Sequence, residues 1–347
     1  MRGHAVIIGG GIGGLAAATA LGNDGWRVTV RERDAALPAA GTALGMWPAA
    51  LRALDAMKAG QAVRETGAPQ RSGEVRRPDG SRIVTIRTPA DDPVHLISRP
   101  ALLTILHRAA VDADIRFADP VDGLGSLDAD LIVVADGVFS RTREHLFGPA
   151  YRARYSGTTA WRGTVDGLST DMFVEMWGRG AKFGVTPQEG GRTNWFAAAG
   201  APPGSFHPGE EAGVLRRMFG DWADPVAPVL EAVTEAGILH HDVYVTPPLP
   251  SYVSGNAVLI GDAAHAMTPD LGRGACEALV DAVTLARCLR ETSTTADGLR
   301  SYDRRRRPVT RRLARMAGAA GRLSRVRHAL PVRDGLLWAS MLAGPPE

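Results

Sequence analysis

The sequence is poor in lysine and in cysteine. Lys58 and Lys182 are the only lysines among its 40 basic residues, so arginine carries nearly all of the positive charge. The two cysteines, Cys276 and Cys288, fall in one predicted helix, and their separation of 12 positions (288 − 276) places them about 18 Å apart. That distance excludes a disulfide between them. Nothing therefore points to an oxidising compartment, and we expect a cytoplasmic location.

The sequence also lacks long apolar runs and metal-ligand patterns. No run reaches the roughly 20 apolar residues of a membrane-spanning helix. The first predicted strand begins at Ala5, which leaves no room for a signal peptide. We find neither a cluster of metal ligands nor the turn that carries a nucleophilic serine. We therefore expect no metal site and no membrane partner.

The net charge of +3 in 347 residues conceals an uneven distribution. Arginines gather late in the chain, at positions 304–307, 311, 312, 315, 322, 325 and 327. Such a run is compatible with a nucleic-acid-binding patch or with the solvated face of a helix. No aromatic residues are interleaved with it and no known nucleic-acid motif accompanies it. The sequence favours the helix face, and we expect no nucleic-acid partner.

A glycine-rich turn near the N-terminus carries the strongest signal. A strand ends at Gly9, Gly11 and Gly14 open a helix, and a second strand leads to Glu32. In this pattern the first glycine permits the turn, the second admits a pyrophosphate, and the third allows helix and strand to pack. The helix N-terminus favours phosphate, and the acid suits a ribose hydroxyl. We predict a dinucleotide site, because a generic glycine turn would not explain Glu32.

Two further acids follow predicted buried strands. Asp136 comes after the strand 130–135, and Asp262 comes after the strand 257–260. In a doubly wound sheet, the carboxyl ends of the strands carry the ligands. The loop after Asp262 leads to Gly272–Gly274, where a helix begins whose free N–H groups face whatever lies above it. The three acid-bearing strand ends together indicate one extended ligand site.

The remaining segments predict an α/β protein with a Rossmann-like nucleotide-binding domain built from separated segments. An antiparallel β-sheet substrate domain is inserted into it, and the C-terminus is helical. We assign residues 1–73, 98–150 and 253–297 to the first domain, 74–97 and 151–252 to the second, and 298–347 to the C-terminal helices. Short strands are expected at 158–165, 172–177, 181–186 and 193–198, with helices at 101–111, 211–219, 228–236 and 274–289.

The three motifs, in this order, resemble those of the single-component flavin-dependent monooxygenases of the para-hydroxybenzoate hydroxylase type. The matching residues are the glycine turn, Asp136-Gly137 with Ser140 and Arg143, and Gly261-Asp262 with Pro269, Gly274 and Asp281. The segments Met46–Pro48, Ser98–Leu103, Thr159–Gly163 and Trp177–Gly180 are similar to the urate and salicylate hydroxylase branch. The resemblance covers nearly the whole chain.

The resemblance implies that FAD binds in an extended form. The implied contacts are Gly9, Gly11, Gly14, Glu32, Arg33, Gly45, Arg99, Val121, Asp136, Asp262, Gly272, Arg273, Gly274, Ala275 and Cys276. It further implies that NADPH or NADH reduces FAD without a second nucleotide fold. A flavin C4a-hydroperoxide would then transfer one oxygen atom from O2 to an aromatic, heteroaromatic or unsaturated small molecule. The alternatives are an FAD-dependent oxidase or reductase, or a non-catalytic flavin-binding partner protein.

The chain departs from the family at the flavin-facing helix. Asp270 and Arg273 stand where the family often has Asn and Gln. In the urate hydroxylase branch the acid communicates with a cation on the substrate sheet, and the corresponding cation here is Lys182. The resemblance thus implies that Lys182, Asp270 and Arg273 act in catalysis. The alternative is a plain salt bridge between Asp270 and Arg273.

The substrate-lining residues are expected on the inserted sheet. Trp177, Asn194, Trp195 and Tyr244 are the candidates, although core packing would explain the tryptophans as well. Asn194 aligns with a tyrosine that faces substrate in the urate hydroxylases, which argues against urate as the substrate. Arg162 is interpreted as structural, and the segment 335–342 as docked on the body of the protein. We expect a monomer or homodimer.

Overall fold

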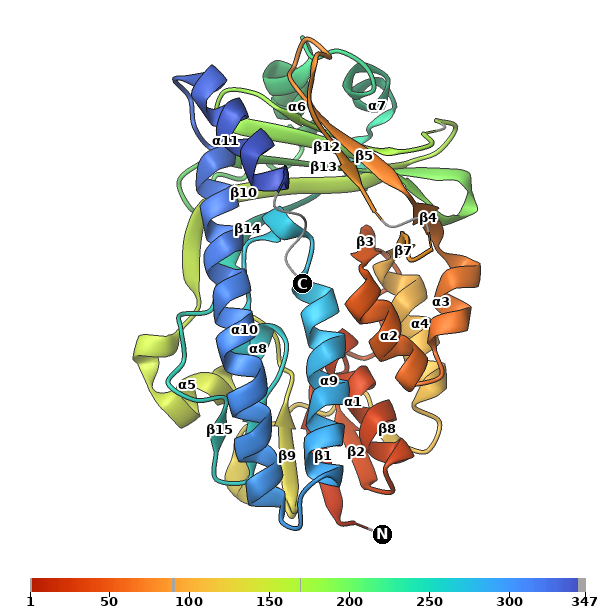
Figure 1. Cartoon of the computed structure of the whole chain (residues 1–347), viewed down its shortest axis with the longest axis vertical. Coiled ribbons are helices and arrows are strands. Elements are labelled where there is room, and N and C mark those ends of the chain that lie inside the picture. Colours follow the sequence, from red (N-terminus) through yellow and green to blue (C-terminus); the bar gives the residue numbers. More distant parts are fainter. Residues whose placement is uncertain (1, 89–90, 169, 343–347) are drawn as a thin grey trace.

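The structure is a computed structural model that describes residues 2–88, 91–168 and 170–342. It consists of two large sheets stacked one above the other and joined along one side by a long helix (Figure 1). The predicted fold class is confirmed: a nucleotide-binding half, an inserted sheet and C-terminal helices are all present.

The lower sheet has six strands in the order β15-β16-β9-β1-β2-β8. Their bounds are β1 His4–Ile8, β2 Arg27–Arg31, β8 Asp114–Arg116, β9 Leu131–Val134, β15 Val253–Ser254 and β16 Ala257–Leu259. All neighbours are parallel except β15 and β16. β9 and β16 are buried along their whole length, as the apolar runs predicted. The carboxyl ends of β1, β9 and β16 therefore meet at one edge, which brings the three motifs together.

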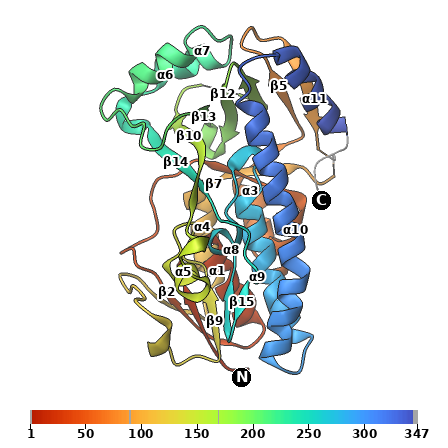
Figure 2. The same ribbon diagram turned by 90° about the vertical axis from the view of Figure 1, so that its left-hand side faces the viewer.

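The upper sheet has seven strands in the order β14-β10-β13-β12-β11-β5-β6. Their bounds are β5 Ser72–Arg76, β6 Arg82–Arg87, β10 Arg154–Val165, β11 Phe173–Trp177, β12 Ala181–Gln188, β13 Arg192–Gly200 and β14 Leu239–Val245. All pairs are antiparallel except β11 and β5. The helices α6 (Glu211–Phe219) and α7 (Val226–Ala232) lie on the face turned away from the lower half (Figure 2). The opposite face is free to meet the nucleotide-binding half.

A small third sheet links the two halves. It contains β3 (Ala43–Met46), β7 (Val94–Ser98) and β4 (Ala68–Gln70), in the order β3-β7-β4. β7 pairs with β3 and β4 and thus belongs to this small sheet, while the assignment of residues 94–97 to the substrate domain remains a prediction. The other predicted domain boundaries remain a prediction.

Helices cover the lower sheet and run up beside both halves. Their bounds are α1 Ile12–Asn23, α2 Pro48–Ala56, α3 Gly60–Thr66, α4 Arg99–Ala109, α5 Arg141–Phe147, α8 Asp262–His265, α9 Gly274–Arg290, α10 Thr295–Ser324 and α11 Leu330–Leu342. Ser98 caps α4 as predicted, since its hydroxyl accepts from the Ala101 N–H at 3.3 Å. No helix in the described part of the chain is long and apolar enough to cross a bilayer.

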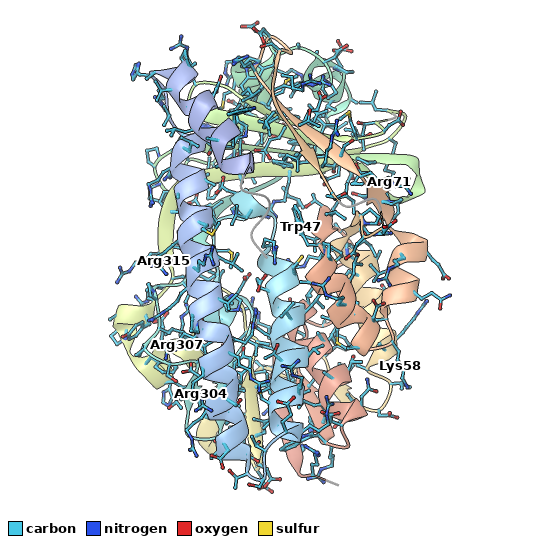
Figure 3. All side chains as sticks on the ribbon, in the orientation of Figure 1. Trp47, Lys58, Arg71, Arg304, Arg307 and Arg315 are labelled. Atoms are coloured by element: carbon cyan, nitrogen blue, oxygen red, sulfur yellow. The ribbon has the colours of Figure 1, made fainter. Side chains whose placement is uncertain are left out.

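The arginine-rich segment forms α10, which spans the height of the molecule (Figure 2). Arg304, Arg307 and Arg315 project from its outer side (Figure 3). Arg306 instead turns inward and is buried. α11 follows and docks on the upper sheet through Leu337, which packs against Val75, Val84 and Trp177. The expected docking of this segment is therefore observed.

Candidate functional site

The glycine turn has the backbone shape that the motif predicts. Gly9 has φ of +104°, and a side chain there would approach the Ala135 carbonyl oxygen to 2.5 Å. A Cβ at Gly14 would overlap the Gly9 carbonyl oxygen, so this glycine lets α1 pack against β1. At Gly11 nothing lies within 4 Å of the Cβ position. The start of α1 is thus open to a ligand.

Glu32 lies over the glycine turn. Its Oε2 accepts from the Gly10 N–H at 2.5 Å, and its Oε1 accepts from the Asp34 N–H at 2.8 Å. The acid thus stabilises the turn as well as facing the site. Arg33 is exposed and stands 3.8 Å from the Asp34 carboxylate.

Arg143 fastens the second motif to the third. Its guanidinium is fully buried and donates to the carbonyls of Val138, Tyr151 and Ala263 at 2.7, 2.8 and 3.0 Å. The Ser140 hydroxyl accepts from the Arg143 N–H at 2.9 Å, which starts α5. One residue therefore holds the loop after β9 against the loop after β16.

Two acids at these strand ends are available to a ligand. Asp136 Oδ2 accepts from the Thr142 N–H at 3.3 Å, but its Oδ1 is buried without a partner among the described residues. Asp262 remains accessible to solvent, and the protein packed around it raises the pKa of its carboxyl group. A buried acceptor without a donor is costly, so Asp136 fits a hydroxyl-bearing ligand.

The start of α9 completes the site. Gly272 adopts a left-handed conformation with φ of +61°, and a Cβ at Gly274 would stand 4.0 Å from Asp262 Oδ1. Trp47 lies at the head of α9, between the two halves (Figure 3), and its Nε1 is 3.8 Å from the Cβ positions of both Gly45 and Gly272. These residues bring open backbone, two hydroxyl acceptors and a helix N-terminus together, which suits a long dinucleotide such as FAD.

Cys276 serves the packing of this region. The thiol is buried and donates to the Gly45 carbonyl at 3.1 Å, which ties β3 to α9. Burial raises its pKa to about 11, so it stays a neutral thiol. Among the predicted cofactor contacts, Arg99 is exposed beside β3, Val121 packs on the lower core, and Ala275 is half-buried at the start of α9.

Lys182 and Asp270 form the predicted pair. Lys182 Nζ stands 3.1 Å from Asp270 Oδ1 and 3.1 Å from Glu175 Oε1. Burial acts to lower the pKa of Lys182, but the two carboxylates outweigh it and raise the pKa, so the lysine is charged. Lys182 lies on β12, and Asp270 belongs to the short 3-10 turn η5 (Pro269–Leu271) just before α9. The pair therefore joins the upper sheet to the loop before α9.

The helix α10 leaves space for this pair. A Cβ at Gly321 would stand 2.6 Å from Asp270 Oδ2 and 3.5 Å from Thr268 Oγ1. Only glycine allows α10 to approach η5 this closely without displacing the Asp270 carboxylate.

Arg273 belongs to a second network of buried charges. Its Nη2 stands 3.0 Å from Glu277 Oε1, and its guanidinium lies 5.9 Å from the Trp47 ring. Arg306 of α10 bridges Glu277 Oε2 and Asp281 Oδ1, each at 2.6 Å. The salt bridge expected as an alternative, between Asp270 and Arg273, is not the one formed, because each residue has its own partner.

Asp281 is the inner end of this network. It also accepts from the Gly261 N–H at 2.8 Å and pairs with His265 at 2.6 Å. Burial acts to raise its pKa, but His265 and Arg306 lower it to about 2. The network thus links the turn before Asp262 to the start of α9 and to α10.

The predicted substrate-lining residues separate into two faces of the upper sheet. Asn194 and Trp177 share the face of Lys182, which is turned toward the lower half, because Trp177 pairs directly with Lys182 and Asn194 bonds to β3. Trp195 was wrongly expected there. It is 1% exposed and stacks on Phe183 in the core under α6 and α7. Tyr244 lies on the edge strand, 5.0 Å from the Phe139 ring and 5.7 Å from the Tyr155 ring.

The polar atoms of Asn194 are engaged by the protein. Its Oδ1 accepts from the Ala43 N–H at 3.0 Å, and its Nδ2 donates to Thr186 Oγ1 at 2.9 Å. Asn194 therefore positions β3 under the sheet.

Sequence reasoning missed Phe196, which lies on the same face as Lys182 and is only half-buried. Its ring lies 5.9 Å from Lys182 Nζ and covers Gly184. The alternation along β13 points to it, because Phe196 is two residues from Asn194. A separate hollow of about 420 Å³ beside α11 is lined by none of the residues predicted to bind FAD or substrate.

Comparison with known proteins supports this arrangement. The sequence pattern of the family described as FAD binding domain matches residues 104–317. The chain is 36% identical over 307 residues to aurachin C monooxygenase/isomerase of Stigmatella aurantiaca, covering 82% of this chain and 80% of that protein. It is 29% identical over 330 residues to FAD-dependent urate hydroxylase of Klebsiella pneumoniae, with coverages of 87% and 85%.

Among solved structures, a variant of Klebsiella pneumoniae HpxO complexed with FAD is similar to this chain. The TM-score is 0.86 at 26% sequence identity, and the match covers 98% of this chain and 94% of that one. The similarity includes the nucleotide-binding half, the inserted sheet and the C-terminal helices.

Proposed function

This chain belongs to the FAD-binding family of single-component flavoprotein monooxygenases and is an FAD-dependent enzyme, and we propose that NADPH or NADH is its reductant. We further propose that the enzyme inserts one oxygen atom from O2 into an aromatic, heteroaromatic or unsaturated small molecule. The observation that carries this proposal is the meeting of three strand-end motifs beneath the face of the sheet that presents Lys182 and Phe196. FAD, when bound, supplies the electron transfer and the activation of oxygen.

The residues of the lower half would hold and orient the cofactor. The open backbone at Gly11 and the start of α1 suit its diphosphate, and we propose that the exposed Arg99 neutralises it. Asp136 Oδ1 and the Asp262 carboxylate suit hydroxyl groups, since neither accepts from a donor within the described ranges of the chain. The N-terminus of α9 would favour negative charge on the ring by about 0.3–2 kcal/mol.

The residues of the upper sheet would hold the substrate against the ring. Phe196 offers an aromatic surface, and the charged pair of Lys182 and Asp270 sets the electrostatic field beside it. We propose that Lys182 and Asp270 act together during reduction or oxygen transfer, and that Arg273 orients the start of α9. Because Asn194 is engaged by Ala43 and Thr186, we propose a substrate other than urate.

A substrate screen with labelled oxygen tests the proposal. The purified, FAD-loaded protein is mixed with NADPH or NADH and with panels of phenols, quinolones, purines and polyenes under isotopically labelled O2. We expect one panel to stimulate consumption of the reductant and to give a product carrying one labelled oxygen atom. Stimulated consumption with only hydrogen peroxide formed, across all panels, would instead indicate an oxidase.

A further inference from the structure

Arg162 lies on the face of the upper sheet that is turned toward the nucleotide-binding half. It pairs directly with Phe196 of β13, and directly opposed residues of an antiparallel pair share a face. Phe196 in turn alternates with Asn194, whose amide oxygen binds the Ala43 N–H below the sheet. The side chain of Arg162 therefore belongs to the same surface as Lys182 and Phe196.

Arg162 has no counterion in the part of the chain that the structure describes. It is half-buried, yet among residues 2–88, 91–168 and 170–342 its guanidinium makes neither a hydrogen bond nor a salt bridge. Burial lowers its pKa, and the charge of Arg99 lowers it further. An arginine removed from water without a partner is costly. Packing alone gives no reason to place a guanidinium here.

Two other basic residues, Arg99 and His241, lie near enough to Arg162 for the charges to act on one another. Arg99 begins α4 beside β3, and its N–H donates to the Thr42 carbonyl at 3.1 Å. His241 of the neighbouring strand β14 carries a pKa that burial, and then the charge of Arg162, lower. Both Arg99 and His241 are exposed to solvent, so a ligand can reach them. The charge of Arg99 also acts to lower the pKa of the Asp262 carboxyl group, although these two described residues form no salt bridge.

We propose that Arg162, together with Arg99 and His241, binds an oxyanion, a phosphate or carboxylate group carried by a ligand that lies between the two halves. A guanidinium presents paired N–H donors that match either group. Three ligands of the proposed function bring such chemistry: the diphosphate of FAD, the diphosphate of the reductant, and a carboxylate of the substrate. This proposal adds an anion-binding site to the proposed function. It rests on the proposed function only for the identity of the ligand that carries the anion.

Binding measurements test the site without turnover. Arg162→Met removes the charge, Arg162→Lys keeps it, and Arg71→Gln changes an exposed arginine in the link between β4 and β5 (Figure 3). Calorimetry measures inorganic pyrophosphate and benzoate on the FAD-loaded proteins, and fluorescence quenching measures FAD on the apoproteins. We expect Arg162→Met to weaken at least one of these ligands by about 10- to 100-fold. Arg162→Lys should lose less, and Arg71→Gln should match wild type.

The three binding measurements distinguish the possible sources of the anion. Loss of FAD affinity alone assigns the site to the cofactor, loss of pyrophosphate binding assigns it to the reductant, and loss of benzoate binding assigns it to the substrate. Unchanged affinity for all three ligands in Arg162→Met overturns the proposal. Failure to find an oxygenated product would leave these affinities untouched, so the two proposals fail separately.

Thermal unfolding of the apoprotein gives a second readout. If Arg162 awaits an anion, Arg162→Met removes an uncompensated buried charge and should keep or raise the midpoint. If the arginine is structural, the same substitution should lower the midpoint by several degrees. That lowering, with unchanged ligand affinities, would mark Arg162 as a packing residue.

Discussion

The buried arginines Arg143 and Arg306 and the half-buried Arg162 are treated in opposite ways by their surroundings. In the lower half, Arg143 and Arg306 are buried, and their guanidinium groups contact carbonyl, hydroxyl and carboxylate oxygens of the protein. On the upper sheet, Arg162 is half-buried and has no such partner among the described residues. The difference separates charges that build the fold from a charge that is kept for a ligand.

Lys182 combines the two properties, because it is paired within the protein and also belongs to the proposed site. It is buried against two acids, Glu175 and Asp270, and each comes from a different element. Its pairing with Asp270 joins the upper sheet to the loop before α9, so the same contact can support the fold and the proposed chemistry. The predictions below test whether the comparison holds at each of these positions.

The largest effect is expected at Arg306. Arg306→Met should lower the free energy of unfolding by roughly 3–5 kcal/mol, because Glu277 and Asp281 are then buried without their shared cation. Arg304→Met, on the exposed side of the same helix, should stay within about 0.5 kcal/mol of wild type. Denaturant unfolding of the two variants measures the difference. Equal stabilities would mean that the network does not hold α10 in place.

The next effect concerns Asp262 and FAD. Asp262→Ala should weaken FAD binding by about 10- to 100-fold, since a charge-assisted hydrogen bond contributes roughly 1.5–3 kcal/mol. The fold should survive, because the Asp262 side chain is accessible. Titration of apoprotein with FAD, followed by fluorescence quenching, measures the affinity. An unchanged dissociation constant would remove Asp262 from the cofactor site.

A smaller, coupled effect is expected for the pair of Lys182 and Asp270. Lys182→Gln and Asp270→Asn should each slow substrate-stimulated flavin reduction or oxygen transfer while FAD stays bound. The double variant should lose less than the sum, with a coupling of about 0.5–3 kcal/mol, because the two groups are in contact. Stopped-flow absorbance of the three variants measures the rates. Strict additivity, or wild-type rates in Asp270→Asn, would confine the pair to a structural role.

The smallest effect should come from Gly321. Gly321→Ala introduces a methyl group 2.6 Å from Asp270 Oδ2 and should displace that carboxylate from Lys182. We expect the rate of flavin reduction to fall toward that of the Asp270→Asn variant, and the free energy of unfolding to fall by about 1–3 kcal/mol. Gly318→Ala is the matched control on the same helix, since the nearest atom to its Cβ position is 3.9 Å away. Identical rates in the two variants would show that Gly321 does not position Asp270.

The sequence predicts the lower half well because its constraints are local. The turn at Gly9 and the acids at Asp136 and Asp262 follow directly from strands whose apolar runs are unmistakable. The contact between Lys182 and Asp270 was also predicted, although it joins residues 88 positions apart (270 − 182), because family resemblance supplied the pairing.

The upper sheet was harder to predict because alternation does not say which face meets the ligand. Trp195 was assigned to the substrate side, whereas its neighbour Phe196 lies there, and a shift of one residue exchanges the two faces. The network around Arg306 also escaped prediction, since nothing in the arginine run distinguishes Arg306, which is buried, from its exposed neighbours. Pairings between α9 and α10 depend on tertiary packing and leave no periodic signal.

One measurement tests the central distinction most directly: the thermal midpoints of Arg306→Met and Arg162→Met, side by side, in the apoprotein. Both substitutions replace an arginine with a methionine of similar reach, one in the paired network and one on the unpaired surface. We predict a large fall for Arg306→Met and an unchanged or raised midpoint for Arg162→Met. A comparable fall in both variants would contradict the account, because Arg162 would then be a structural residue like Arg306.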